Sequence, residues 1–261
     1  MRVILTALVL LAAPVIAGAA SRRVLFVGNS YTHVNDLPGM VGLLARSMGD
    51  EFSSEMSAPG GFRLKDHAGF ADTLKRLDAG GWDAVVLQEQ SQVPGWEDRQ
   101  LATDMDPYAT ELARRARAAG PKTRIVFYSA WGRKDGDAQN CKEIPSVCAY
   151  EGQQKRITRT YARLADRLEG EAAPVGAAWA RLRREHPEVA LYSGDGSHPS
   201  LEGTYLAACV FYATLFGKPL GRASALSLPP ERAQLLQRYA QEAVFAERRR
   251  RRLTSTTALS P

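Results

Sequence analysis

Short apolar runs alternate with longer amphipathic segments along the chain. Runs rich in Val, Ile, Leu and Phe are typical of strands buried on both faces of a parallel sheet. They predict strands at 23–28, 82–87 and 123–128, with a weaker candidate at 51–58 and a last one at 173–176.

The segments between these runs carry apolar residues at helical spacing. They predict helices over 37–48, 70–77, 107–119 and 151–168, then a helix through 179–184 and two more over 200–216 and 230–249. Strands that alternate with helices, without tandem hairpins, indicate a parallel sheet covered by helices on both sides. We therefore expect one doubly wound α/β domain with a central sheet of about five strands.

The first twenty residues have a different pattern. They contain one early arginine, Arg2, an apolar stretch interrupted by Pro14, and the small residues Ala17, Gly18 and Ala19. This pattern is typical of a secretory signal peptide, and the apolar run of about 15 residues is short for a membrane span of about 20. An uncleaved anchor is the alternative. We expect residues 1–20 to be a signal peptide, the folded domain to cover 21–247, and the protein to be secreted or periplasmic.

The composition is that of an ordinary folded protein, because 45% of the 261 residues are hydrophobic and 24% are charged. Disordered, collagen-like and coiled-coil proteins are excluded. The formal net charge is +6, but removing Arg2 and the five consecutive arginines near the end leaves 28 basic and 28 acidic residues. Those five are Arg248, Arg249, Arg250, Arg251 and Arg252.

Residues 248–261 are therefore predicted to be a basic, disordered tail that makes at most a weak contact with an anionic surface. No aromatic residues are interleaved with the arginines, and no RNA-type motif lies nearby. We expect no nucleic-acid partner.

The chain has three cysteines and neither a C-x-x-C pair nor a Cys/His cluster at ligand spacing, which argues against a structural metal site. Cys141 and Cys148 bracket six residues within the Gly-, Asp- and Pro-containing segment 131–150. Export to an oxidising compartment would permit a disulfide between them. Cys209 lies in an apolar run and is predicted to be a small buried hydrophobe.

Two loops carry candidate catalytic chemistry. Ligands of open parallel sheets bind at the carboxyl ends of the strands, and Ser30 follows the first predicted strand in the sequence GNS. Asp195 precedes His198 by three residues, so its carboxylate could accept the Nδ1–H of the imidazole and leave Nε2 free to take a proton from a serine hydroxyl. Each residue alone would be an ordinary turn or surface residue. Together they predict a Ser-His-Asp site.

These residues resemble the SGNH (GDSL-like) hydrolase superfamily, in particular a branch of secreted bacterial proteins. The likeness rests on LFVGNSYT, on NDLP, on PGG near residue 60, on VVLQEQS and on DGSHPSLEGTYLAACVFYATLFG, and it extends over essentially the whole mature chain. It implies a flavodoxin-like, three-layer α/β/α fold. It also implies metal-free and cofactor-free ester hydrolysis through an acyl-enzyme, with Ser30 as nucleophile, His198 as general base and Asp195 as its orienting partner.

The resemblance also implies an oxyanion hole. In the superfamily its donors are usually the N–H of the nucleophile, a Gly N–H after the second strand and an Asn side chain after the third. Here Ser30 supplies the first donor, and Gly60 or Gly61 fits the second.

The third donor departs from the family pattern. VVLQEQSQ contains no Asn but three glutamines, Gln88, Gln90 and Gln92. A Gln amide can donate the same hydrogen bond from one methylene further out. Strand alternation would place Gln88 and Gln90 on one face, so these two are the candidates for this role.

Further polar and aromatic residues are predicted near the site. His33 and His67 are expected at its rim. Trp96 and Trp131 are expected to shape the acyl or alcohol pocket, where exposed aromatic rings would suit sugar stacking.

Two functions fit these patterns. The first is a secreted serine esterase acting on a small-molecule or carbohydrate-linked ester. The alternative is a protein with the same fold but no useful turnover, which binds glycan or envelope components. The absence of the family's Asn from VVLQEQSQ would indicate this loss of activity. A nucleotide or flavin binder is disfavoured because GNSYT lacks a Gly-rich phosphate cradle. The acyl group, the alcohol and the oligomeric state stay open.

Overall fold

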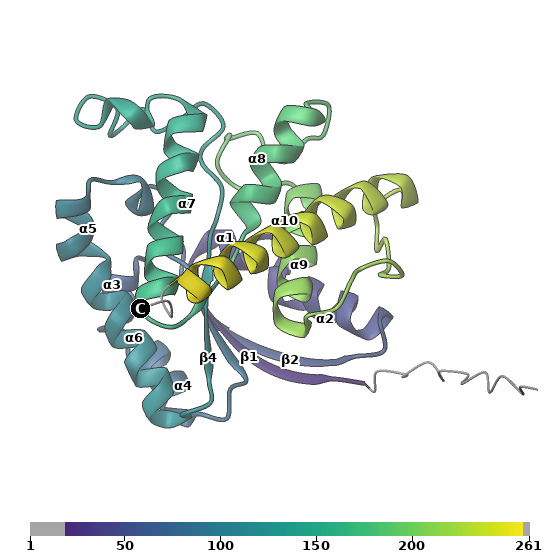
Figure 1. The fold of residues 1–261 in the computed structure, drawn as a ribbon, viewed down its shortest axis with the longest axis horizontal. Helices are drawn as coiled ribbons and strands as arrows, with labels where there is room; N and C mark the ends of the chain where they lie inside the picture. The colour runs from purple at the N-terminus through teal and green to yellow at the C-terminus, as the bar shows by residue number, and fades with distance from the viewer. Residues whose placement is uncertain (1–18, 258–261) are drawn as a thin grey trace, which may run out of the picture.

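Five parallel strands form the centre of the molecule. The computed structural model describes residues 19–257, with side chains to 253 (Figure 1). The strands lie in the order β2-β1-β3-β4-β5. They are β1 (Ser21–Val27), β2 (Glu51–Ser57), β3 (Ala84–Leu87), β4 (Arg124–Tyr128) and β5 (Glu171–Ala173). This confirms the predicted doubly wound sheet.

Alternation along the strands divides the core into two layers. Val24 and Phe26 of β1 pack on one side of the sheet, and Leu25 and Val27 on the other, and all four are fully buried. One side is covered by α2 (Leu37–Ser47), α8 (Val175–Glu185), α9 (Leu201–Phe216) and α10 (Pro230–Thr257). The other side is covered by α4 (Ala71–Ala79), α6 (Asp106–Ala119) and α7 (Tyr150–Arg167). The fold is a three-layer α/β/α sandwich (Figure 1).

Short helices follow several of the strands and were not predicted. They are α1 (Ser30–His33), α3 (Leu64–His67) and α5 (Asp98–Asp104), together with 3-10 turns at Val34–Asp36, Val93–Gly95 and Pro145–Val147. One or two turns give too little hydrophobic periodicity to be seen in sequence. They shape the loops at the carboxyl edge of the sheet.

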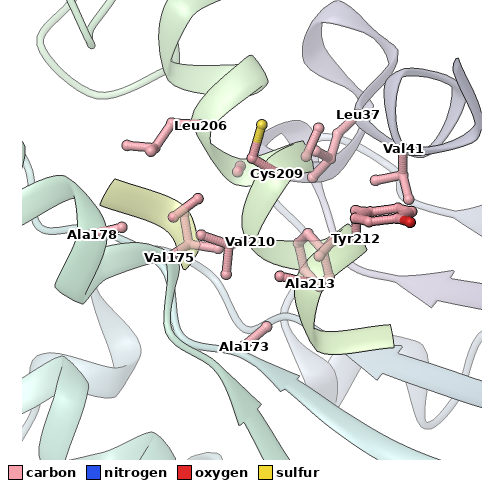
Figure 2. Packing of buried hydrophobic residues seen from close by; sticks show 14 of the residues in the cluster. Leu37, Val41, Ala173, Val175, Ala178, Leu206, Cys209, Val210, Tyr212 and Ala213 are labelled. Carbon is pink, nitrogen blue, oxygen red and sulfur yellow. The ribbon is translucent and has the colours of Figure 1, made fainter. Parts of the chain in front are cut away.

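Helix α9 is apolar around its whole circumference because it is buried on every side. Figure 2 shows its side chains between Leu37 and Val41 of α2 on one flank and Ala173, Val175 and Ala178 on the other. Helix α10 packs along the same helix (Figure 1). Within this packing the free Cys209 is fully buried, as predicted.

The last strand was predicted two residues too late. It spans Glu171–Ala173 rather than 173–176, and α8 begins at Val175. Pro174 stands between them and has no N–H to continue the ladder. The apolar residues after it belong to a helix that packs back on the sheet.

The prediction of a disordered tail is wrong for residues 248–257, which continue α10. Arg248 donates to the carbonyl of Ala213 near the end of α9 at 3.1 Å, and Arg250 pairs with Asp166 and Glu247. These contacts hold part of the arginine run against the domain. Residues 258–261, and residues 1–18 of the predicted signal peptide, lie outside the described part of the chain. None of the described helices is both long and apolar enough to cross a membrane.

Candidate active site

The loops at the carboxyl edge of the sheet enclose a cavity of about 230 Å³. Ser30 begins helix α1 after β1, while Gly61, Gln90 and Arg133 come from the loops after β2, β3 and β4. The described residues that line it are Asn29, Ser30, Tyr31, Gly61, Gln90, Ser91, Arg133, Ser197 and His198. The chain runs from β1 to β2 on one side of it and then to β3 on the other side, so the order of the strands changes direction at β1. Open α/β sheets bind ligands at such a point, which is where the cavity lies.

Local backbone contacts place Ser30 at this edge. A side chain on Gly28 would meet Gln88 Oε1 and Thr32 Oγ1 at 2.5 Å, so only glycine fits there. Asn29 then caps α1 by accepting from Tyr31 N at 3.2 Å, which makes Ser30 the first helical residue. Its backbone N–H has no acceptor within the described chain.

Ser30, His198 and Asp195 form a continuous chain of hydrogen bonds. His198 Nε2 lies 2.8 Å from Ser30 Oγ, and His198 Nδ1 lies 2.5 Å from Asp195 Oδ2. The bond to His198, together with backbone N–H donors from Ser197 and His198, holds the pKa of the Asp195 carboxyl far below its usual range. An ionised Asp195 favours the tautomer with hydrogen on Nδ1, which leaves Nε2 to accept a proton from Ser30.

An aromatic stack supports the loop that carries His198. Tyr31 stacks on Trp131 at 4.6 Å between centroids, and Trp131 stacks on Trp179 at 4.0 Å. Trp131 Nε1 donates to the carbonyl of Ser197 at 2.9 Å. Because Trp131 is fully buried, the expectation that it stacks on sugars as an exposed ring is wrong. Its place is beneath the site.

Asn35 ties the first loop to the same segment. Its side chain donates to Thr204 Oγ1 at 2.9 Å and to the carbonyl of Pro199, next to His198, at 3.3 Å. Asn35 and Asp36 both have positive φ, 55° and 49°, which is strained for residues other than glycine. The hydrogen bonds of Asn35 to Pro199 and Thr204 help to hold the backbone in this conformation beside the site.

Two of the residues predicted to supply oxyanion donors, Ser30 and Gly61, line the cavity. The N–H of Ser30 has no other acceptor in the described chain, and Gly61 lines the same cavity. Gly61 has a φ of +75°, and a Cβ on it would meet no atom within 4 Å, so the backbone there is open to a ligand. Gly60 is not among the residues that line the cavity.

The expectation that Gln88 donates to an oxyanion is wrong. Its side chain is fully buried, and Nε2 already donates to Asn29 Oδ1 at 2.8 Å and to the carbonyl of Glu89 at 2.6 Å. Its Oε1 accepts from Asn29 N and from Thr32 Oγ1. Strand β3 ends at Leu87, so strand alternation does not extend to the glutamines. Gln88 positions the loop that carries Ser30.

Gln90 remains the candidate for the third donor. It lines the cavity and donates from Nε2 to Gln92 Oε1 at 3.2 Å. An amide nitrogen carries two hydrogens, so one stays available.

Glu89 supports the loop that carries Gln90 and was not predicted from the sequence. It is fully buried and accepts from Gln90 N at 2.7 Å and from Leu64 N at 3.3 Å, which joins the loop after β3 to helix α3. Burial raises the pKa of its carboxyl to about 8. An acidic residue between two glutamines looks solvent-exposed in sequence, and its place directly after a buried strand was the only signal.

The two histidines expected at the rim differ. His33 is exposed and its Nδ1 contacts the carbonyl of Ala58 at 2.7 Å. His67 is fully buried between Thr73 Oγ1 and the carbonyl of Gly28, at 2.7 and 2.8 Å, so its placement at the rim is wrong. Burial lowers the pKa of His67, which keeps it neutral as a support for the strand that precedes Ser30.

No protein-family model and no curated protein matches the sequence. Solved structures do match it. A DUF4886 family protein from Bacteroides uniformis has a TM-score of 0.74 at 18% identity, over 86% of this chain and 95% of its own. A protein from Slackia heliotrinireducens assigned to the SGNH hydrolases is 30% identical, with a TM-score of 0.60, over 75% of this chain and 99% of its own. A protein from Parabacteroides merdae assigned to the GDSL-like lipases is 15% identical, with a TM-score of 0.56, over 78% and 99%.

Proposed function

The chain belongs to the SGNH hydrolases, and we propose that it is a secreted serine esterase that cleaves small or carbohydrate-linked acyl esters with Ser30, His198 and Asp195. The observation that carries this proposal is the unbroken chain of hydrogen bonds from Asp195 through His198 to Ser30 at the mouth of a cavity. A module that only binds glycans has no need of an aligned nucleophile and base.

In the first half-reaction, Ser30 Oγ attacks the ester carbonyl carbon while His198 Nε2 takes the hydroxyl proton. The carbonyl electron pair moves to the oxygen, which the N–H groups of Ser30 and Gly61 and the amide of Gln90 would stabilise. When the tetrahedral intermediate collapses, the bond to the alcohol oxygen breaks and His198 returns its proton to that oxygen. An acyl-enzyme on Ser30 remains.

In the second half-reaction, water attacks the acyl carbon and His198 takes one of its protons. Collapse of this second intermediate breaks the bond to Ser30 Oγ, which regains the proton from His198. The products are the carboxylic acid and free enzyme. Asp195 stays ionised throughout and stabilises the imidazolium at both stages.

Labelling with a fluorophosphonate probe tests the nucleophile directly. The wild type should label and hydrolyse p-nitrophenyl acetate, whereas Ser30→Ala should do neither. Ser53→Ala, which changes an exposed serine of β2, is the matched control and should label as the wild type does. A folded wild type that neither labels nor hydrolyses any ester of a short acyl series would favour the binding module instead.

Secretion is part of the same proposal. It is supported by the signal-peptide pattern of residues 1–20 and by the Cys141–Cys148 disulfide, which an oxidising compartment permits. Mass spectrometry of the protein from an exporting host should show a chain that begins near residue 20. Intact residues 1–20 in the exported protein would contradict cleavage.

A further inference from the structure

Arg133 brings a positive charge into the catalytic cavity. Among the described residues that line this cavity none is a carboxylate, and Arg133 is the only permanently charged one. It lies in the loop after β4. Ser30, the proposed nucleophile, lines the same cavity.

The hydrogen-bonding capacity of Arg133 is largely unused. Nη2 donates to Gln92 Oε1 at 3.2 Å, while Nε is buried without a partner. Within the described chain its guanidinium forms no ion pair. Keeping a partly buried charge without a counter-ion costs free energy. An anionic ligand that pairs with the guanidinium would offset this cost.

The position of Arg133 is nevertheless fixed from both ends. Its backbone N–H donates to Gln153 Oε1 of α7 at 2.8 Å. Gln92, which holds the guanidinium, is itself fixed because its Nε2 donates to Asp137 Oδ1 at 2.7 Å and to Gln139 Oε1 at 2.8 Å. Asp137 is almost fully buried, and its backbone N–H donates at 2.7 Å to the carbonyl of Val147, which lies in the loop closed by the Cys141–Cys148 disulfide. Arg133 is therefore a preorganised cation rather than a mobile surface arginine.

We infer that Arg133 is a specificity residue that binds an anionic group, a carboxylate, carried by the ester substrate. The inference rests on the proposed esterase function and narrows its substrate class to acidic esters. A planar guanidinium with free N–H groups matches a carboxylate in geometry as well as charge. The carboxylate can belong to the acyl part or to the alcohol part of the ester, and the two arms of the experiment separate these cases.

The acyl arm compares p-nitrophenyl hydrogen succinate with p-nitrophenyl butyrate. The alcohol arm compares 4-acetoxybenzoate with 4-acetoxybenzamide. In at least one arm, the ratio of kcat/KM for the anionic over the neutral ester should fall about ten- to hundredfold in Arg133→Gln, the loss expected for one charge-assisted bond. Arg133→Lys should retain part of the ratio, and added salt should lower it in the wild type.

Lys134→Gln is the matched control, since it removes the same charge from an exposed neighbouring residue outside the cavity lining, and it should keep the ratio. An unchanged ratio in both arms for Arg133→Gln would overturn the inference. If the wild type hydrolyses no ester, calorimetry of the two anionic esters with Ser30→Ala and with the Ser30→Ala/Arg133→Gln double variant decides the matter without turnover. About tenfold weaker binding of at least one ester to the double variant supports the anion site, and equal binding of both refutes it.

Discussion

At the scale of single residues, the site depends on groups that hold the reacting atoms in place. Asp195 accepts from His198 Nδ1 and from two backbone N–H groups, so it fixes both the tautomer and the orientation of the imidazole. Gln88 accepts a hydrogen bond from Asn29 N, and His67 contacts the carbonyl of Gly28, so both fix the backbone that precedes Ser30. Both side chains are buried and neither lines the cavity, so Gln88 and His67 are positioning residues rather than catalytic ones.

Asp195→Asn should lower kcat for p-nitrophenyl acetate by roughly three to four orders of magnitude, because a carboxamide can stabilise the wrong imidazole tautomer. Fluorophosphonate labelling should slow in parallel while the melting temperature stays close to that of the wild type. A variant that kept most of the wild-type kcat would contradict the assigned role of Asp195.

Glu89 makes the stability of the fold depend on pH. Its pKa is about 8 in the folded protein, above the ordinary value of 4.5, so the folded state binds the proton more tightly than the unfolded chain. Its contribution is complete below about pH 4.5 and is lost as pH rises through 8, at up to about 1.4 kcal/mol per pH unit. Urea unfolding at pH 5, 6.5 and 8 should show this loss in the wild type and not in Glu89→Gln.

Other groups titrate in the same interval, so the informative quantity is the difference between the two proteins at each pH. Glu143→Gln removes an exposed glutamate and should follow the wild type. A Glu89→Gln protein whose unfolding free energy fell in parallel with the wild type would rule out Glu89 as the source.

At the scale of elements, the segment between β4 and α7 is stiffened by the bridge between Cys141 and Cys148, whose Cα atoms lie 4.6 Å apart. Replacing both cysteines by serine should lower the free energy of unfolding by about 2 kcal/mol, the loop-closure entropy of so short a loop. It should also lower the ester kcat/KM, because Asp137 and Gln139 of this segment hold Gln92. Calorimetry and ester kinetics measure the two effects, with Ser146→Ala as a control in the same loop. An unchanged ester kcat/KM would show that the disulfide does not influence the geometry of the site.

The same scale shows what sequence can and cannot predict. Helices with several turns of periodic apolar residues, such as α2 and α7, lie within two residues of their predicted bounds. The hydrogen-bonded arrangement of Ser30, His198 and Asp195 was predictable because Asp195 and His198 are close in sequence and Ser30 follows a strongly apolar strand. The inward position of Gln88 was not predictable, because the sequence alone does not show that β3 ends at Leu87. Arg133 was not either, because a loop arginine gains meaning only from the cavity that it faces.

At the scale of the whole molecule, the C-terminal helix closes the layer that contains α9. Arg248 donates to the carbonyl of Ala213 in the last turn of α9, which also accepts from Gly217 N, and Arg250 pairs with Asp166 of α7. The basic run therefore has a structural role in addition to the predicted weak contact with anionic surfaces. That contact stays a prediction, and retention on anionic liposomes measures it.

Ending the chain after Glu247 should lower the free energy of unfolding by about 1–2 kcal/mol, since it removes charge-assisted bonds to a backbone carbonyl and to partly exposed carboxylates. For a domain of this size that is a fall of roughly 2–8 °C in melting temperature, measurable by calorimetry. Ester kcat/KM below the transition should not change, because none of the removed residues whose side chains the structure describes lines the cavity. If the truncated protein melted with the wild type, the contacts of Arg248 and Arg250 would add nothing to the stability of the fold, and anionic-surface binding would be the remaining explanation for five consecutive arginines.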